Sequence, residues 1–210
     1  LTSPLVGTIG HAWSTRDNFG KRTYFPNEIA IPLVAMACHG IIPYNMYAGG
    51  DSFDKRFVLW GLAYGGNIGW GDTFALDKNL INGFYLQGLP MGLIEYEKME
   101  KYDLTEDYAN AYYTNDSHVF CDNKNQKYEV VKNGIVIAKD YTTFAEGFKE
   151  GTYLAYAAED CTVVYDAPAG WENAVGIEFL NDDKEVALTI KDGKITLPLT
   201  SCQPMRVVKK

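Results

Sequence analysis

The sequence predicts two halves, an α/β half over residues 1–109 and an all-β half over residues 110–210. Two observations support this division. Before about residue 110, short apolar runs alternate with longer apolar segments rich in Gly, Trp and Tyr. After it, short strand-like runs are separated by Asn-Gly and Asp-Gly, which are strong signals for two-residue hairpin turns. Many short strands at such spacing are typical of an antiparallel β-sandwich.

The first half contains three strand candidates, each followed by a helix candidate. The strands are Leu5–Gly10, Ile41–Tyr47 and Asn67–Trp70, and the helices are Ile29–Cys38, Ser52–Tyr64 and one or two segments within Asp77–Lys101. Such alternation predicts parallel strands joined by crossover helices. Three units cannot close a barrel of eight, so we expect the last units of a (β/α)8 barrel. The start at Leu1 and the apolar strand Leu5–Ile9 then indicate that the rest of the barrel comes from upstream sequence or another chain.

The second half begins with strand candidates at Asn110–Tyr113 and His118–Cys121. The turn Asn133-Gly134 predicts a hairpin of Tyr128–Lys132 with Ile135–Lys139, and Asp192-Gly193 predicts a second hairpin of Glu185–Lys191 with Lys194–Leu199. The remaining strand candidates are Thr152–Ala157, Cys161–Tyr165, Ala174–Phe179 and Met205–Val208. The loop Ala167–Trp171 places a Trp over one end of the sandwich, where it either packs or offers an exposed platform for a sugar.

Composition excludes several functions. The net charge of −8 disfavours binding to the phosphates of nucleic acids. No apolar run reaches the roughly 20 residues that cross a membrane. The four cysteines (Cys38, Cys121, Cys161 and Cys202) are widely spaced and form no zinc pattern, so we expect free, buried thiols rather than a disulfide or a metal site. We expect no cofactor, because neither a Walker loop nor a dinucleotide-binding glycine pattern is present.

Candidate site residues follow from the barrel prediction, since barrel active sites lie at the carboxyl ends of the strands. His11, Trp13, Tyr44 and Trp70 lie at those ends and are the predicted substrate-binding residues. Aromatic rings can stack on sugar rings, and an imidazole can bond a hydroxyl group. His11 and Trp13 could equally be packed in the barrel core. His39 at the end of its helix and His118 in the second half have no evident catalytic partner.

Glycoside hydrolysis usually needs two carboxyl groups, about 5–10 Å apart. Asp51 and Asp72 are the acids nearest to the predicted rim, but each also precedes a Ser or Thr at a natural helix start. Their more ordinary interpretation is capping, so the catalytic residues are unknown. The cluster Asn181-Asp182-Asp183 lacks the spacing of an EF-hand and is interpreted as a polar turn.

The stretch Ile31–Tyr44, with the compact piece His39-Gly-Ile-Ile-Pro-Tyr44, resembles the late barrel region of the bacterial endo-α-N-acetylgalactosaminidases and their relatives. Phe57–Trp70 looks like the next unit, and Ala167–Trp171, Lys191–Lys194 and Leu197–Pro204 are similar to the β-domain that follows such barrels. The resemblance implies a retaining mechanism on α-linked sugars, with an Asp nucleophile and a Glu acid/base on earlier strands. No position here matches those motifs, and Asn45-Met46-Tyr47 stands where relatives carry an acid and an amide.

Three functions are open. The first is the C-terminal portion of a glycosidase whose catalytic carboxylates lie outside this chain, with carbohydrate as its partner. The second is a non-catalytic carbohydrate-binding or structural module. The third is a small acidic hydrolase that uses Asp51 and Asp72. An extracellular or cell-surface location suits the first two functions, and the sequence does not decide it.

Overall fold

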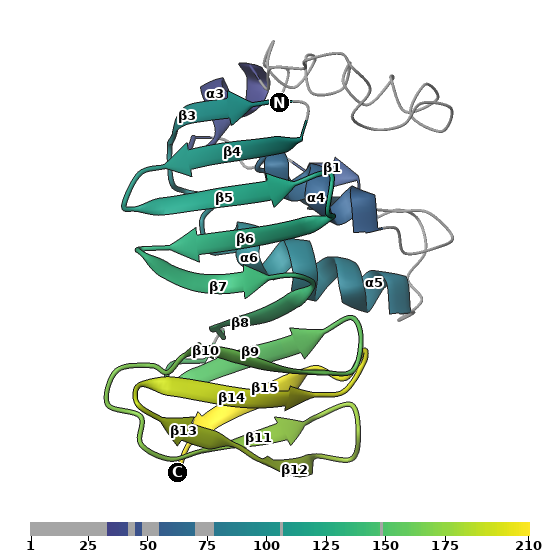
Figure 1. Cartoon of the computed structure of the whole chain (residues 1–210), viewed down its shortest axis with the longest axis vertical. Helices are drawn as coiled ribbons and strands as arrows, with labels where there is room; N and C mark the ends of the chain where they lie inside the picture. Colours follow the sequence, from purple (N-terminus) through teal and green to yellow (C-terminus); the bar gives the residue numbers. More distant parts are fainter. Residues whose placement is uncertain (1–32, 42–44, 48–54, 70–77, 106, 148) are drawn as a thin grey trace.

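The computed structural model describes residues 33–41, 45–47, 55–69, 78–105, 107–147 and 149–210. A long antiparallel sheet dominates these residues and runs almost the full height of the molecule (Figure 1). Its strands lie in the order β12-β11-β15-β9-β8-β7-β6-β5-β4-β3. In chain order these strands are β3 (Met99–Leu104), β4 (Tyr108–Tyr113), β5 (Ser117–Asp122), β6 (Lys127–Lys132), β7 (Ile135–Lys139), β8 (Thr142–Glu146), β9 (Thr152–Ala157), β11 (Ala174–Glu178), β12 (Lys184–Ala187) and β15 (Met205–Lys209).

A second, three-stranded sheet has the order β10-β14-β13, formed by β10 (Cys161–Asp166), β14 (Lys194–Leu199) and β13 (Thr189–Lys191). The chain changes sheets at Leu188, because β12 pairs with β11 whereas β13 pairs with β14. The sequence predicts one strand over Glu185–Lys191, and the structure divides it into these two.

The predicted fold class is wrong. The described residues form mostly antiparallel sheet with short helices, and no portion of an α/β barrel is evident among them. The parallel pair β1 (Asn45–Tyr47) and β2 (Asn67–Gly69) is joined by α4 (Lys55–Ala63), and it forms a two-stranded sheet of its own. The other helices are α3 (Leu33–Cys38), α5 (Lys78–Gly83), the π-helix η1 (Phe84–Gly88) and α6 (Leu89–Gly92). The strand candidate Leu5–Gly10 lies outside the described residues, and the division of domains after residue 109 stays a prediction.

Both predicted hairpins are confirmed. β6 pairs with β7 across Asn133-Gly134, and β13 pairs with β14 across Asp192-Gly193. All four turn residues have positive φ angles, between 51° and 76°. A turn of this kind has the twist that antiparallel strands need, and glycine adopts it without strain.

The long sheet is covered on different faces at its two ends. Along β4–β7, one face packs against α4, η1 and α6 in a core that includes Leu59, Leu86, Val119 and Val130. Small residues of this face, such as Ala109 and Ala111, let the helices approach closely. The Cys121 sulfur lies only 3.5 Å from the carbonyl oxygen of Leu59 in α4.

At the other end, the three-stranded sheet covers the long sheet. Its residues Tyr165, Ile195 and Leu197 pack with Phe144 of β8 and Val207 of β15 in a second core. Phe144 belongs to this second core, whereas its neighbour Ala145 belongs to the helix-side core. Since consecutive residues of a strand point to opposite faces, the two covers lie on opposite faces of the sheet. The predicted β-sandwich is therefore present only around β8–β15.

Candidate functional site: an aromatic face on the long sheet

The predicted site residues do not belong to the described part of the chain. His11, Trp13, Tyr44 and Trp70, and the candidate acids Asp51 and Asp72, all lie outside the described residues.

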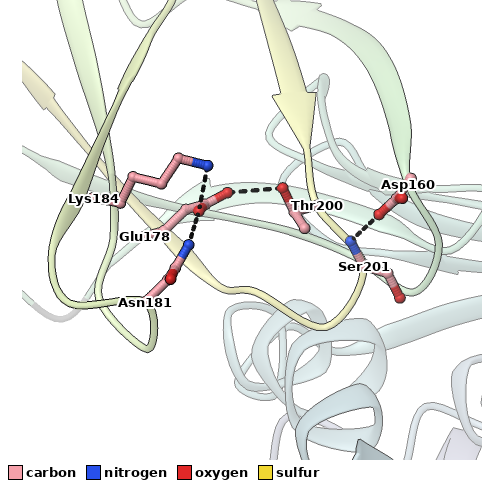
Figure 2. A network of polar contacts seen from close by, with 6 residues as sticks. All are labelled: Asp160, Glu178, Asn181, Lys184, Thr200 and Ser201. Carbon is pink, nitrogen blue, oxygen red and sulfur yellow. Dashed lines mark hydrogen bonds and ion pairs between the residues drawn. The ribbon is translucent and has the colours of Figure 1, made fainter.

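One buried carboxylate lies beside an open groove of about 460 Å³, between the end of β14 and the β11–β12 hairpin. Glu178 is 2% exposed, and its side chain is surrounded by donors (Figure 2). Asn181 Nδ2 donates to Glu178 Oε2 at 2.9 Å, Thr200 Oγ1 donates to Oε1 at 2.9 Å, and Lys184 Nζ lies 3.4 Å from Oε2. Each carboxylate oxygen thus has a partner.

This environment holds Glu178 in its charged form. Burial opposes ionisation, but the hydrogen bonds from Asn181 and Thr200 and the charge of Lys184 outweigh it, so the pKa of Glu178 is lower than its ordinary value. A general acid needs the opposite shift, and a nucleophile needs an oxygen free to attack. Asp160, the other acid of the groove, accepts a 2.6 Å bond from the Ser201 backbone (Figure 2). The network therefore fastens the β11–β12 hairpin to the end of β14 and is not a hydrolytic centre.

His39 also has a structural role. Its ring is 2% exposed, and Nδ1 lies 2.5 Å from the carbonyl oxygen of Glu97. Because a carbonyl can only accept, Nδ1 carries the proton. Burial lowers the pKa of His39 despite the opposing hydrogen bond to Glu97, so the ring is neutral and joins the end of α3 to the segment before β3.

Aromatic side chains gather on the face of β4 and β5 that points away from the helices. Ala109, Ala111, Val119 and Cys121 are buried in the helix-side core. Alternation along a strand then turns their neighbours outward. The outward residues are Tyr108, Asn110 and Tyr112 of β4 and His118, Phe120 and Asp122 of β5, and we call this surface the aromatic face.

The rings of the aromatic face form two groups. Tyr108 and Phe120 lie with ring centroids 6.3 Å apart, and Tyr112 and His118 lie at the same distance. The two tyrosines are each 36% exposed, and the described helices pack only on the opposite face of these strands. The rings therefore remain available to solvent rather than forming part of a core.

Polar groups border the rings. Register places Asp103 of β3, Asn110 of β4, Phe120 of β5 and Glu129 of β6 in one row across the strands. Lys101 lies 5.0 Å from the centroid of the Tyr112 ring and 2.5 Å from Asp103 Oδ2, so its charge is partly balanced. The surface thus combines flat apolar rings with amide and carboxylate groups that can bond hydroxyls.

Other predicted features can be placed. Trp171 packs edge-to-face on Tyr153 with ring centroids 5.3 Å apart and joins the second core, so the interpretation as a packed Trp is confirmed. Asn181–Asp183 forms the β11–β12 turn, as interpreted. All four cysteines are free, with Cys38 and Cys121 buried. In the part of the chain that the structure describes, no group of three His, Cys, Asp or Glu side chains could hold a metal ion. No described helix is both long and apolar enough to cross a membrane.

Comparisons with known proteins do not assign a family. No protein-family model matches the chain, and no curated protein matches its sequence. Among solved structures, a family 39 glycoside hydrolase from the gut symbiont Bacteroides cellulosilyticus WH2 aligns with 60% of this chain and 20% of its own, at 14% identity and a TM-score of 0.25. A protein from Bacillus halodurans C-125, provisionally described as an alpha-N-acetylgalactosaminidase, aligns with 76% of this chain and 33% of its own, at 11% identity and a TM-score of 0.22.

Both of these weak structural neighbours are glycoside hydrolases, and this chain spans at most a third of either of them. TM-scores this low carry no argument about fold or function. The resemblance to endo-α-N-acetylgalactosaminidases therefore stays a prediction that rests on the residues named above.

Proposed function

We propose that this chain is a non-catalytic carbohydrate-binding module that holds a glycan on its aromatic face. The observation that carries the proposal is the outward set of Tyr108, Tyr112, His118 and Phe120 with Asn110 among them. The apolar face of a sugar ring stacks on aromatic side chains, while its hydroxyls bond amides and carboxylates. A tyrosine serves both needs, because it has an apolar ring and a polar tip.

The carboxylates support a binding role over a catalytic one. Among the described residues, the buried acid beside a groove is Glu178, and its two oxygens are occupied by Asn181, Lys184 and Thr200. The link to a glycosidase comes from the sequence resemblance alone. On that basis, the module belongs to an enzyme whose catalytic acids lie elsewhere.

The proposal is tested by titrating the 210-residue chain with soluble oligosaccharides and polysaccharides, using calorimetry and affinity electrophoresis. We expect saturable binding to at least one glycan. Tyr108→Ala and Tyr112→Ala should each weaken it about tenfold, because a stacked ring contributes on the order of 1.4 kcal/mol. Tyr112→Phe, which keeps the ring, should retain most of the affinity.

Phe179→Ala is the matched control. Phe179 is 37% exposed, nearly the same as Tyr108 and Tyr112, and it lies in the β11–β12 turn at the opposite end of the sheet (Figure 1). Its removal should leave glycan affinity unchanged. If no glycan binds across a broad panel, or if Phe179→Ala weakens binding as much as Tyr112→Ala does, the aromatic face is not the binding site.

A further inference from the structure

The two exposed tyrosines of the aromatic face are spaced along β4, and this spacing constrains the ligand if the proposed function holds. Tyr108 and Tyr112 are four residues apart on β4, which corresponds to about 14 Å at roughly 3.4 Å per residue. Each tyrosine has its own partner ring on β5, Phe120 for Tyr108 and His118 for Tyr112. One monosaccharide cannot contact both tyrosines.

The middle of the aromatic face holds an amide beside an aromatic ring. Asn110 lies midway between Tyr108 and Tyr112 on the same face, and register places it opposite Phe120 on β5 and Asp103 on β3. An amide can donate to one hydroxyl and accept from another. A ligand that runs from one ring group to the other therefore passes over a group suited to the hydroxyls of its central units.

The charges on the face select against anionic ligands. Lys101 is held by Asp103 at 2.5 Å, and Lys127 lies opposite Asp122 in register. Glu129 lies in the same row as Asp103 and forms no ion pair with a described residue. Lys139, the cross-strand neighbour of Glu129, instead directs its Nζ to the Val164 carbonyl oxygen at 2.8 Å. The chain as a whole carries −8. A uronic or sulfated polymer would meet repulsion at this surface.

We infer that the ligand is a neutral, extended oligosaccharide that lies along β4, with one sugar ring on the Tyr108–Phe120 group and another on the Tyr112–His118 group. This inference rests on the proposed function and narrows it to a ligand class. It also predicts that the two ring groups act together only when the ligand is long enough to reach both.

The experiment measures affinity for neutral oligosaccharides of increasing length, from disaccharide to hexasaccharide, taken from whichever polysaccharide binds the wild-type chain. We expect affinity to rise at least tenfold once the chain spans both ring groups and to level off beyond that length. For the long ligand, Tyr108→Ala and Tyr112→Ala should each remove this gain. A disaccharide can bind at either tyrosine, so each single variant should retain about half of the wild-type binding. The double variant Tyr108→Ala/Tyr112→Ala should lose it.

Two results would overturn the inference while leaving the proposed function intact. The first is an affinity that does not change with ligand length although Tyr112→Ala still abolishes binding. The second is tighter binding of an anionic polysaccharide than of its neutral counterpart, with a strong dependence on salt. Absence of binding to every glycan would instead overturn the proposed function itself, so the two failures are distinguishable.

Discussion

The hydroxyl of Thr143 in β8 donates a 2.7 Å hydrogen bond to the main-chain carbonyl oxygen of Tyr85 in η1. In this π-helix the backbone N–H bonds the carbonyl five residues earlier, as Leu89 does with Phe84. The next such donor would be residue 90, which is Pro90 and has no N–H. Thr143 therefore supplies the donor that the helix lacks, and it anchors the helix to the long sheet.

Replacing Thr143 by Val should destabilise the protein by about 1–3 kcal/mol, because it leaves the Tyr85 carbonyl without this donor. Thr143→Ser should retain most of the stability. The measurement is urea unfolding followed by circular dichroism. In a Pro90→Ala background, which restores a backbone N–H, Thr143→Val should cost less, and a double-mutant cycle with no coupling would contradict this account.

Gly61→Ala should also destabilise the protein, although Ala favours a helix over Gly by about 1 kcal/mol. A Cβ at this position in α4 would lie 2.1 Å from Nε2 of Gln87. Gln87 is fully buried and donates to the Gly66 carbonyl oxygen at 2.9 Å, so it cannot move aside freely. Overpacking of this kind typically costs about 1–3 kcal/mol. The double variant Gly61→Ala/Gln87→Ala should be more stable than Gln87→Ala alone, as measured by thermal unfolding.

Asp140→Gly should stabilise the protein modestly, by about 0.5 kcal/mol. Asp140 and Tyr141 connect β7 to β8 with φ angles of 44° and 62°, a conformation that costs non-glycine residues roughly 1–2 kcal/mol each. Glycine removes that strain at position 140, but its greater freedom in the unfolded chain lowers the stability by about 0.4–1 kcal/mol. Asp140→Ala should instead destabilise, and equal effects of the two variants in chemical denaturation would contradict the argument.

The contribution of Glu178 to stability should depend on pH. Its pKa in the folded state lies below the ordinary value of 4.5, so it stabilises the fold fully above that pH and loses this effect as the pH falls through its folded pKa. Glu178→Gln should therefore be less stable than the wild type at pH 7, with a difference that shrinks below about pH 4.5. Denaturation curves between pH 3 and 7 measure the difference in unfolding free energy between the wild type and Glu178→Gln. Glu185→Gln, at an exposed position, is the control. A difference that does not change with pH would contradict this account of Glu178.

The second half of the chain was largely predictable because its signals are local. Asn133-Gly134 and Asp192-Gly193 fix their turns through backbone conformations that few other residue pairs adopt. The sequence does not predict two of the strands. β3 (Met99–Leu104) carries charges and overlaps the end of the predicted helical segment Asp77–Lys101, but it forms a strand because it pairs with β4. β8 follows a turn of Asp140 and Tyr141 that has positive φ angles without a glycine to signal them.

The aromatic face was also missed, although the sequence carries its signal. In Tyr108-Ala-Asn-Ala-Tyr112, small residues alternate with aromatic and amide residues, which is the pattern of a strand with one crowded and one open face. The barrel prediction instead places the site at strand ends in the first half. That prediction failed because one parallel pair does not make a barrel: β1 and β2 form a two-stranded sheet, and the long sheet beside it is built by antiparallel pairing.

Phe144 and Ala145 are consecutive in β8 yet serve different cores. Inserting or deleting one residue in β8 would turn the side chains that follow it to the opposite face of the sheet, so that both cores would lose residues at once. Two fragments divided within β8 would therefore each lack part of a core and should not fold independently. Insertions are better tolerated in the loops than in this strand.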